Sequence, residues 1–264
     1  MYRPAIIQEN LQISDRNFVF RQYVRKDTGC CTYLFGATPF GDCVIVDPLM
    51  DFERFLPPSG GKEYHVKHVI DTHIHADHLS GARELCSLTG AKLLMHESSQ
   101  VSCEFEPIGD GMNLNLCGLN VKVLHTPGHA TEHVSLLVDD RFLLSGDSLL
   151  IRDVGRTDLG RGSNEQLYLT LFKKLVLLED KIEVYPAHIG AKHSLTGEQS
   201  STMGIEKHLN PALQLKTFNE FLQYMTEGWP PKPSNYELYI KVNQGQIRLE
   251  EAQRLVQHVA VGEA

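Results

Sequence analysis

Short apolar runs recur along the first 190 residues, and most of them are bounded by glycine, proline or aspartate. Runs of roughly four to eight residues with such boundaries are typical of β-strands. We therefore predict strands at residues 18–24, 31–35, 42–47, 66–71, 92–96, 114–117, 121–124, 134–138, 141–144 and 183–186. This series indicates a protein built on sheets.

Apolar residues at helical spacing predict helices between and after these strands. Leu167, Leu171 and Leu175 recur along one segment, at a spacing that places them on one face of a helix. Three prolines in WPPKPSNYEL break the later helical region, because proline cannot continue a helix. The predicted helices are residues 81–88, 165–178, 200–226 with an interruption at Pro211, and 248–258. The alternation of strands and helices predicts sheets covered by helices, an α/β architecture.

The composition is that of an ordinary globular protein. With 264 residues, 42% of them apolar and 22% charged, the chain can bury a full core. It contains no internal repeat, low-complexity tract or clear linker;. We interpret residues 1–264 as a single domain, with a core at about 15–210 and a helical, Pro-rich C-terminal extension at about 211–264.

Charge and hydropathy argue against two classes of partner. The formal net charge is -8 and the lysines and arginines are scattered, so no basic face is available to attract nucleic acid or an anionic membrane. No apolar run approaches the roughly 18 residues that a membrane helix needs, and the N-terminus lacks the pattern of an export signal;. We expect a cytoplasmic protein with no nucleic-acid and no membrane partner.

The six cysteines show no CxxC spacing, and without an export signal we expect free thiols. We interpret most of these cysteines as small apolar core residues. The adjacent Cys30 and Cys31 lie at a turn flanked by glycine, where a reactive thiol is the alternative interpretation.

Three histidines and an aspartate follow the predicted strand at 66–71, as His73, His75, Asp77 and His78 in THIHADH. Alternate residues of an extended segment share a face, so His73 and His75 are expected to point the same way. Imidazole and carboxylate ligands suit Zn, Fe or Mn, and the lack of cysteine argues against a closed structural zinc site. The pattern predicts a site for one metal ion or two.

Three more predicted strands end in a histidine or an aspartate: His129 in TPGH, Asp147 in SGD and His188 in YPAH. An aspartate or histidine at a single strand end is often an ordinary turn residue. Four such ends in one chain are hard to explain by chance, and we predict that they complete the metal site. His125 and His133 are expected to be polar neighbours instead of ligands.

The motifs THIHADH, TPGH, SGD and YPAH, in this order, resemble the metallo-β-lactamase superfamily over nearly the whole chain. The resemblance implies an αββα sandwich, in which two mixed β-sheets are flanked by helices and the metal site lies where strands end. The segment GRTD at 155–158 and the tail TEGWPPKP at 226–233 are more similar to the persulfide dioxygenase (sulfur dioxygenase) branch than to glyoxalase II.

The resemblance also implies a ligand set. His73, His129 and Asp147 match the facial triad that holds one non-haem Fe(II) per chain in that branch, and this donor set leaves coordination positions open. Further residues match the second metal position of zinc hydrolases and would orient ligands in the iron branch: His75, Asp77, His78 and His188.

The implied reaction oxidises the sulfane sulfur of glutathione persulfide or a similar low-molecular-weight persulfide to sulfite, with O2. Arg156 matches an arginine near the substrate, and it either clamps a substrate carboxylate or pairs with Asp153 or Asp158. The chain departs from the animal-type dioxygenases at Gly190, where they carry a tyrosine. A rhodanese segment, fused in some bacterial relatives, does not follow in this sequence, so a separate rhodanese is the expected sulfur-transfer partner, if there is one. A homodimer is expected because dimers are common in the family.

Two other functions stay open at this stage. A dinuclear zinc hydrolase of glyoxalase II (hydroxyacylglutathione hydrolase) type would use two Zn²⁺ and a metal-bound hydroxide to cleave a glutathione thioester. Every ligand position of that class is present, so ligand counting does not separate it from the dioxygenase. A catalytically idle metal-binding or sulfur-carrier protein is the third interpretation.

Overall fold

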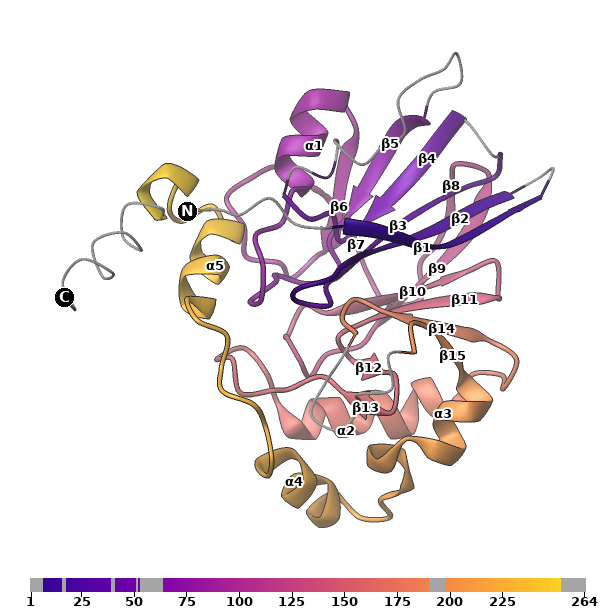
Figure 1. Cartoon of the computed structure of the whole chain (residues 1–264), viewed down its shortest axis with the longest axis vertical. Coiled ribbons are helices and arrows are strands. Elements are labelled where there is room, and N and C mark those ends of the chain that lie inside the picture. Colours follow the sequence, from indigo (N-terminus) through magenta and orange to yellow (C-terminus); the bar gives the residue numbers. More distant parts are fainter. Residues whose placement is uncertain are drawn as a thin grey trace.

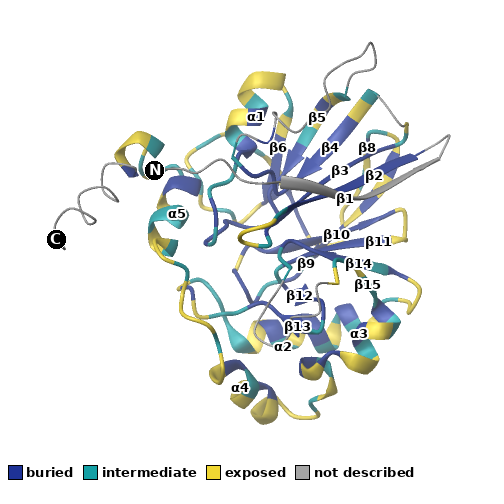
Figure 2. Ribbon diagram, in the orientation of Figure 1, coloured by how far each residue is buried: buried dark blue, intermediate teal, exposed yellow. Residues whose placement is uncertain are grey.

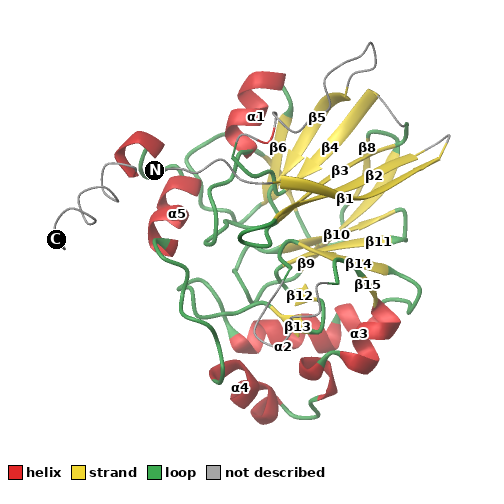
Figure 3. Cartoon of the chain, in the orientation of Figure 1, coloured by secondary structure: helices red, strands yellow, loops and turns green. Residues whose placement is uncertain are grey.

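The computed structural model describes residues 7–15, 18–38, 41–50, 52, 64–189 and 198–252, which form layers of helix, sheet, sheet and helix (Figure 1). Helix α1 (Ala82–Thr89) covers the outer face of the first sheet. Helices α2 (Asn164–Lys173), α3 (Met203–Leu209) and α4 (Phe218–Thr226) lie on the side of the second sheet (Figure 3). The predicted αββα sandwich is confirmed.

The first sheet is mixed. Its strands follow chain order, and pairing is antiparallel from β1 to β4 and parallel from β4 to β7. The strands are β1 (Ile7–Asp15), β2 (Phe18–Arg25), β3 (Cys31–Gly36), β4 (Gly41–Val46), β5 (Tyr64–Ile70), β6 (Lys92–His96) and β7 (Glu106–Ile108).

The second sheet has the order β15-β14-β11-β10-β9-β8, and only β11 and β14 pair in parallel. Helix α2 lies in the connection between these two strands, as a parallel pair requires a long crossover;. The strands are β8 (Asn113–Leu116), β9 (Leu119–His125), β10 (Val134–Val138), β11 (Phe142–Gly146), β14 (Glu183–Pro186) and β15 (Ser201–Thr202). A separate hairpin joins β12 (Leu149–Leu150) and β13 (Asp153–Val154).

The main core lies between the sheets, because successive side chains of a strand point to opposite faces. Phe142 and Leu144 of β11 enter the core between the sheets, whereas Leu143 between them packs towards α2. The ring centroids of Phe20 and Phe142 are 4.6 Å apart, so the two sheets meet through stacked aromatic rings;. Both sheets are buried along most of their length (Figure 2).

The outer helices begin at side-chain caps. Ser163 accepts a hydrogen bond at the start of α2, and Thr217 forms a capping box with Glu220 at the start of α4;. Leu167 and Leu171 of α2 are fully buried against the second sheet. The leucine spacing therefore identified the face of α2 that packs on the sheet.

Several sequence predictions are corrected by the structure. The helix predicted at 165–178 ends at Lys173 and continues as a 3₁₀ turn, η2 (Leu175–Leu177). The region 200–226 is no single helix but β15, α3, the 3₁₀ turn η3 (Pro211–Gln214) and α4. The Pro-rich break ends in a helix that was not predicted, α5 (Tyr236–Asn243). Strands β1, β7, β12, β13 and β15 were also missed.

The helix predicted at 248–258 is described only as far as residue 252, and the rest lies outside the described residues. Within the part of the chain that the structure describes, no helix is long and apolar enough to cross a membrane.

Candidate metal centre

The predicted site residues come together at one edge of the sandwich. His73 follows β5 of the first sheet, while His129 follows β9 and Asp147 follows β11 of the second. His188 follows β14 and forms a backbone bridge with Cys30 at the start of β3. The site therefore lies between the two sheets, at strand ends that are far apart in the sequence.

His73, His129 and Asp147, which we call the triad, place one ligand atom each within 4.8 Å of one another. The Nε2 of His73 and the Oδ1 of Asp147 are buried and have no hydrogen-bond partner. A buried polar atom without a partner is costly and rare in native proteins. These two atoms fit a metal ion as their missing partner.

Hydrogen bonds at the far nitrogen orient both triad imidazoles. The Nδ1 of His73 lies 3.0 Å from the Thr72 hydroxyl, which itself donates to Asp47 at 2.9 Å. The Nδ1 of His129 lies 2.7 Å from the Arg156 carbonyl oxygen and donates to it. Both rings therefore leave Nε2 as the ligand atom, the usual arrangement of metal-binding histidines.

Burial, helped by the neighbouring imidazole of His75, holds the pKa of His73 well below its ordinary value. The ring is therefore neutral at physiological pH, and a neutral imidazole is the form that binds metal.

Asp147 is positioned by His133. The backbone N–H of Asp147 donates to His133 Nε2 at 2.9 Å, and His133 Nδ1 lies 2.8 Å from the Thr126 hydroxyl. Gly146 precedes Asp147 with a φ of 55°, and a Cβ there would lie 2.3 Å from His133 Nε2. Glycine at this turn is required both by the backbone conformation and by the space.

Asp77 is the centre of a second group, which we call the paired cluster and which contains Cys30, Asp77, His78 and His188. Asp77 lies 3.0 Å from His78 Nδ1, 3.4 Å from His188 Nδ1 and 3.2 Å from Cys30 Sγ. Burial and the nearby carboxylate of Asp77 raise the pKa of the Cys30 thiol, so the S–H donates to Asp77. The carboxylate in this cluster is satisfied by protein donors.

His75 faces a buried carboxylate. Its Nε2 lies 3.0 Å from Asp47 Oδ1. Burial opposes the charged ring, but the charge of Asp47 and its hydrogen bond prevail and raise the pKa of His75 to about 10. Asp47 thus fixes the ring by Nε2 and leaves Nδ1 facing Asp77, 3.9 Å away.

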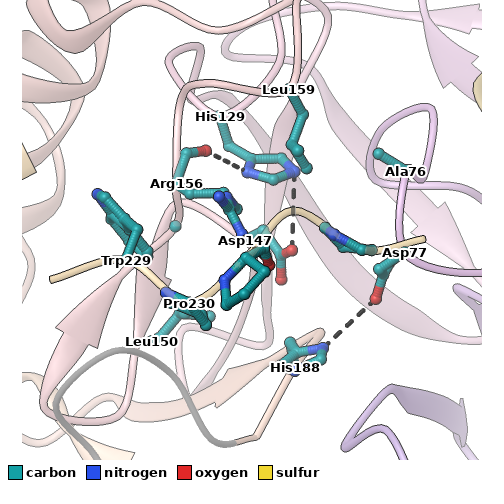
Figure 4. Close-up of a pocket in the computed structure, with 13 residues that line it drawn as sticks. Ala76, Asp77, His129, Asp147, Leu150, Arg156, Leu159, His188, Trp229 and Pro230 are labelled. Atoms are coloured by element: carbon teal, nitrogen blue, oxygen red, sulfur yellow. Dashed lines mark hydrogen bonds and ion pairs between the residues drawn. The ribbon is translucent and has the colours of Figure 1, made fainter. Parts of the chain in front are cut away.

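A pocket of about 170 Å³ opens beside the triad (Figure 4). His129 and Asp147 line it together with Asp77 and His188, and its opposite wall includes Trp229 and Pro230. Leu150, Leu159, Pro231 and Pro233 add further apolar surface. The pocket thus combines a few converging polar groups with an apolar wall, as small-molecule sites generally do.

Arg156 lines this pocket but is paired within the protein. Its guanidinium makes two hydrogen bonds to Asp158, at 2.7 and 3.0 Å, and lies 5.5 Å from the centroid of the Trp229 ring. Of the two ion pairs considered from the sequence, Asp153 and Asp158, the structure has the one with Asp158.

The sequence motifs did not place several further residues at the metal centre. Cys30, Asp47 and Trp229 reach the centre only through the fold, as does Asn243 of α5, which hydrogen-bonds the loop that carries His75 and His78. All six cysteines are free, as expected. Gly190 lies outside the described residues.

Comparison with known proteins agrees with this architecture. The family model described as the metallo-beta-lactamase superfamily matches residues 27–104 and 117–188. The mitochondrial persulfide dioxygenase ETHE1 of Mus musculus is 30% identical over 231 residues, which cover 85% of this chain and 87% of that protein.

Two solved structures are similar over most of the chain. The crystal structure of ETHE1 from Myxococcus xanthus has a TM-score of 0.77 and 31% identity, and covers 85% of this chain and 97% of its own. A metallo-beta-lactamase from Staphylococcus aureus has a TM-score of 0.78 and 27% identity, and covers 88% of this chain and 73% of its own. The chain therefore belongs to the metallo-beta-lactamase superfamily, in the branch of persulfide dioxygenase ETHE1, and this membership implies a metal centre.

Proposed function

We propose that the protein is an Fe(II)-dependent persulfide dioxygenase acting on glutathione persulfide or a similar low-molecular-weight persulfide. The observation that carries this proposal is the triad, in which two imidazoles and one carboxylate converge and two of the donor atoms lack any other partner. Two histidines and one carboxylate with open positions are typical of non-haem Fe(II) oxygenases. The likeness to persulfide dioxygenases supports the same conclusion.

The proposed reaction is RSSH + O2 + H2O → RSH + SO3²⁻ + 2 H⁺. The sulfane sulfur loses four electrons and O2 gains them, so no other oxidant is needed. The residues that would hold iron are His73, His129 and Asp147, and iron bound there would supply the redox chemistry between the persulfide sulfur and O2;.

The protein's own contribution is orientation and exclusion of water. Thr72 and the Arg156 carbonyl fix the triad rings, while His133 fixes the backbone of Asp147. The apolar wall with Trp229 shields the reacting sulfur, which lowers the local dielectric and limits side reactions with water. His75, Asp77, His78 and His188 lie beside the triad. Asp77 pairs with His78 and His188, and Asp47 fixes the His75 ring.

Metal analysis combined with oxygen consumption tests the proposal. Protein purified without added metal is assayed for bound metal, and glutathione persulfide is then added under reducing conditions. We expect about one iron per chain, oxygen uptake and release of sulfite. Iron-loaded protein that consumes no oxygen with this substrate would refute the proposal.

The second candidate is a dinuclear zinc hydrolase of glyoxalase II type. The paired cluster favours it, because Asp77 and His188 lie where a second ion would bind beside Asp147;. About two zinc ions per chain, no oxygen uptake and cleavage of a glutathione thioester would establish the hydrolase. The homodimer, the separate rhodanese and the cytoplasmic location stay predictions.

A further inference from the structure

The C-terminal extension reaches the loop that carries the predicted metal ligands. After α4, the chain passes the pocket at Trp229 and then forms α5, which runs along the flank of the sandwich (Figure 1). Helix α5 ends at Asn243, whose side chain is 9% exposed. The C-terminal extension thus contributes both to the pocket wall, through Trp229, and to the support of the ligand loop, through α5.

Asn243 uses its whole side-chain amide on this loop. Its Nδ2 donates to the carbonyl oxygens of His75 and His78, both at 2.9 Å, and its Oδ1 accepts the Ser80 backbone N–H at 3.0 Å. A flipped amide would place Oδ1 against two carbonyl oxygens, so the partners fix its orientation. The three bonds span both ends of the segment that includes Asp77 and His78.

The turn after α5 is itself tied to the body of the protein. Arg83 of α1 donates to the Val242 carbonyl, and Ser102 donates to the carbonyls of Gln244 and Gly245 at 2.9 and 3.1 Å. Gly245 has a φ of 72°, and a Cβ there would lie 2.1 Å from Ser102 Oγ. Asn243 is therefore presented to the loop from a fixed backbone.

The opposite side of the loop is held by the core of the domain. Glu132 accepts the Ile74 backbone N–H at 3.0 Å, and Asp47 holds the His75 ring. Apart from a backbone bridge between Ser80 and Leu49 at its end, the loop has no backbone pairing of a helix or strand. The geometry of the loop therefore depends largely on these side chains. Asn243 is the side chain by which the C-terminal extension supports the loop.

We propose that Asn243 is a positioning residue for the metal centre: by fixing the backbone of the loop at residues 73–80, it lets the site retain its metal. Residues that orient metal ligands typically change metal affinity by roughly 10–100-fold when removed. Asn243 acts through the His75 and His78 carbonyls and touches no triad atom directly. The inference rests on the metal centre and not on the persulfide reaction.

Metal loss from the full-length protein tests this role without any substrate. Wild type, Asn243→Ala, Asn243→Asp and Lys241→Ala are loaded with cobalt(II), and loss of the visible cobalt absorption is followed after addition of EDTA. Lys241 is the control because it lies exposed on the same helix. We expect both Asn243 variants to lose cobalt about 10-fold faster than wild type, with an altered ligand-field spectrum, and Lys241→Ala to match wild type.

Folding is monitored in parallel by circular dichroism. The Asp variant keeps the acceptor for the Ser80 N–H, so it separates loss of the two donor bonds from loss of the whole contact;.

A folded Asn243→Ala protein with the wild-type rate and spectrum would overturn the inference. Two variants that fail to fold would make Asn243 a requirement of the fold instead, and the positioning role would be abandoned. Wild type that binds no cobalt would overturn the metal centre itself, whereas failed oxygen uptake would affect only the proposed reaction.

Discussion

The triad and the paired cluster both combine histidines with one aspartate, and the paired cluster adds the thiol of Cys30, but the two groups differ in how their carboxylates are satisfied. In the triad, His73 Nε2 and Asp147 Oδ1 are buried without a partner. In the paired cluster, Asp77 is surrounded by His78, His188 and the Cys30 thiol. The triad thus leaves two ligand atoms without a partner, whereas the paired cluster leaves one, His78 Nε2, and its carboxylate is already satisfied.

The difference indicates how each group responds to a metal. An orphaned buried donor atom costs about 1–3 kcal/mol, and an ion bound by the triad would remove this cost. An ion at the paired cluster would have to displace protons and break hydrogen bonds that already exist. We therefore expect one tightly held ion at the triad and weaker binding at the paired cluster.

Asp147→Ala should have the largest effect. The triad loses its carboxylate, so metal content should fall from about one ion per chain to near zero, and activity should fall to background. Metal analysis of the folded variant, together with an activity assay, measures both. Retained metal with full turnover would remove the assignment of the site altogether.

Asp77→Ala should separate the two groups. Because Asp77 belongs to the paired cluster, the variant should keep its ion while activity falls by roughly 10–100-fold, the range found for residues that orient ligands. The same metal analysis and assay apply. Two ions in wild type and one in this variant would contradict the contrast and support the dinuclear hydrolase.

His133→Phe should weaken the triad without touching its donor atoms. An aromatic ring of slightly larger size is kept, but the Asp147 N–H loses its acceptor and the Thr126 and Ser148 hydroxyls lose their contact with Nδ1, which costs about 1–3 kcal/mol in stability for a buried group left without a partner. Urea unfolding of metal-free protein measures this cost, and a competition titration measures metal affinity. His125→Phe is a control for the change from histidine to phenylalanine at a less buried position, since His125 stacks on His96 and contacts the Thr131 carbonyl. Equal effects of the two substitutions would show that His133 does not position Asp147.

Much of the site could be predicted from sequence because its residues follow strand ends. His73, His129 and Asp147 follow within a few residues of strand ends, and turn residues such as Gly128 and Gly146 mark where the chain leaves the sheet. Parallel and antiparallel strands that end at one edge bring such residues together. The strand pattern therefore predicted both the sandwich and the convergence of the ligands.

The supporting contacts could not be predicted, because they depend on residues distant in sequence. Asn243 joins the loop of His75 across more than half of the chain, and its helix follows a Pro-rich segment that gave no helical signal. Cys30 was interpreted as a core residue or a reactive thiol, and only its bridge to His188 places it beside Asp77. The sequence did not decide whether Asp153 or Asp158 forms an ion pair with Arg156, because both are near it in sequence.

Cys30→Ala should have the smallest effect. Asp77 would lose one hydrogen bond but keep His78 and His188, so stability should fall by about 1 kcal/mol and metal content should not change. Cys31→Ala is the matched control, because Cys31 is equally buried and its thiol donates to the Gly29 carbonyl instead.

Thermal unfolding and metal analysis measure the two outcomes, and cobalt(II) loading adds a spectroscopic test. A thiolate-to-cobalt charge-transfer band that is present in wild type and in Cys31→Ala but absent in Cys30→Ala would make Cys30 a metal ligand. The paired cluster would then be a second metal site, and the contrast with the triad would fail.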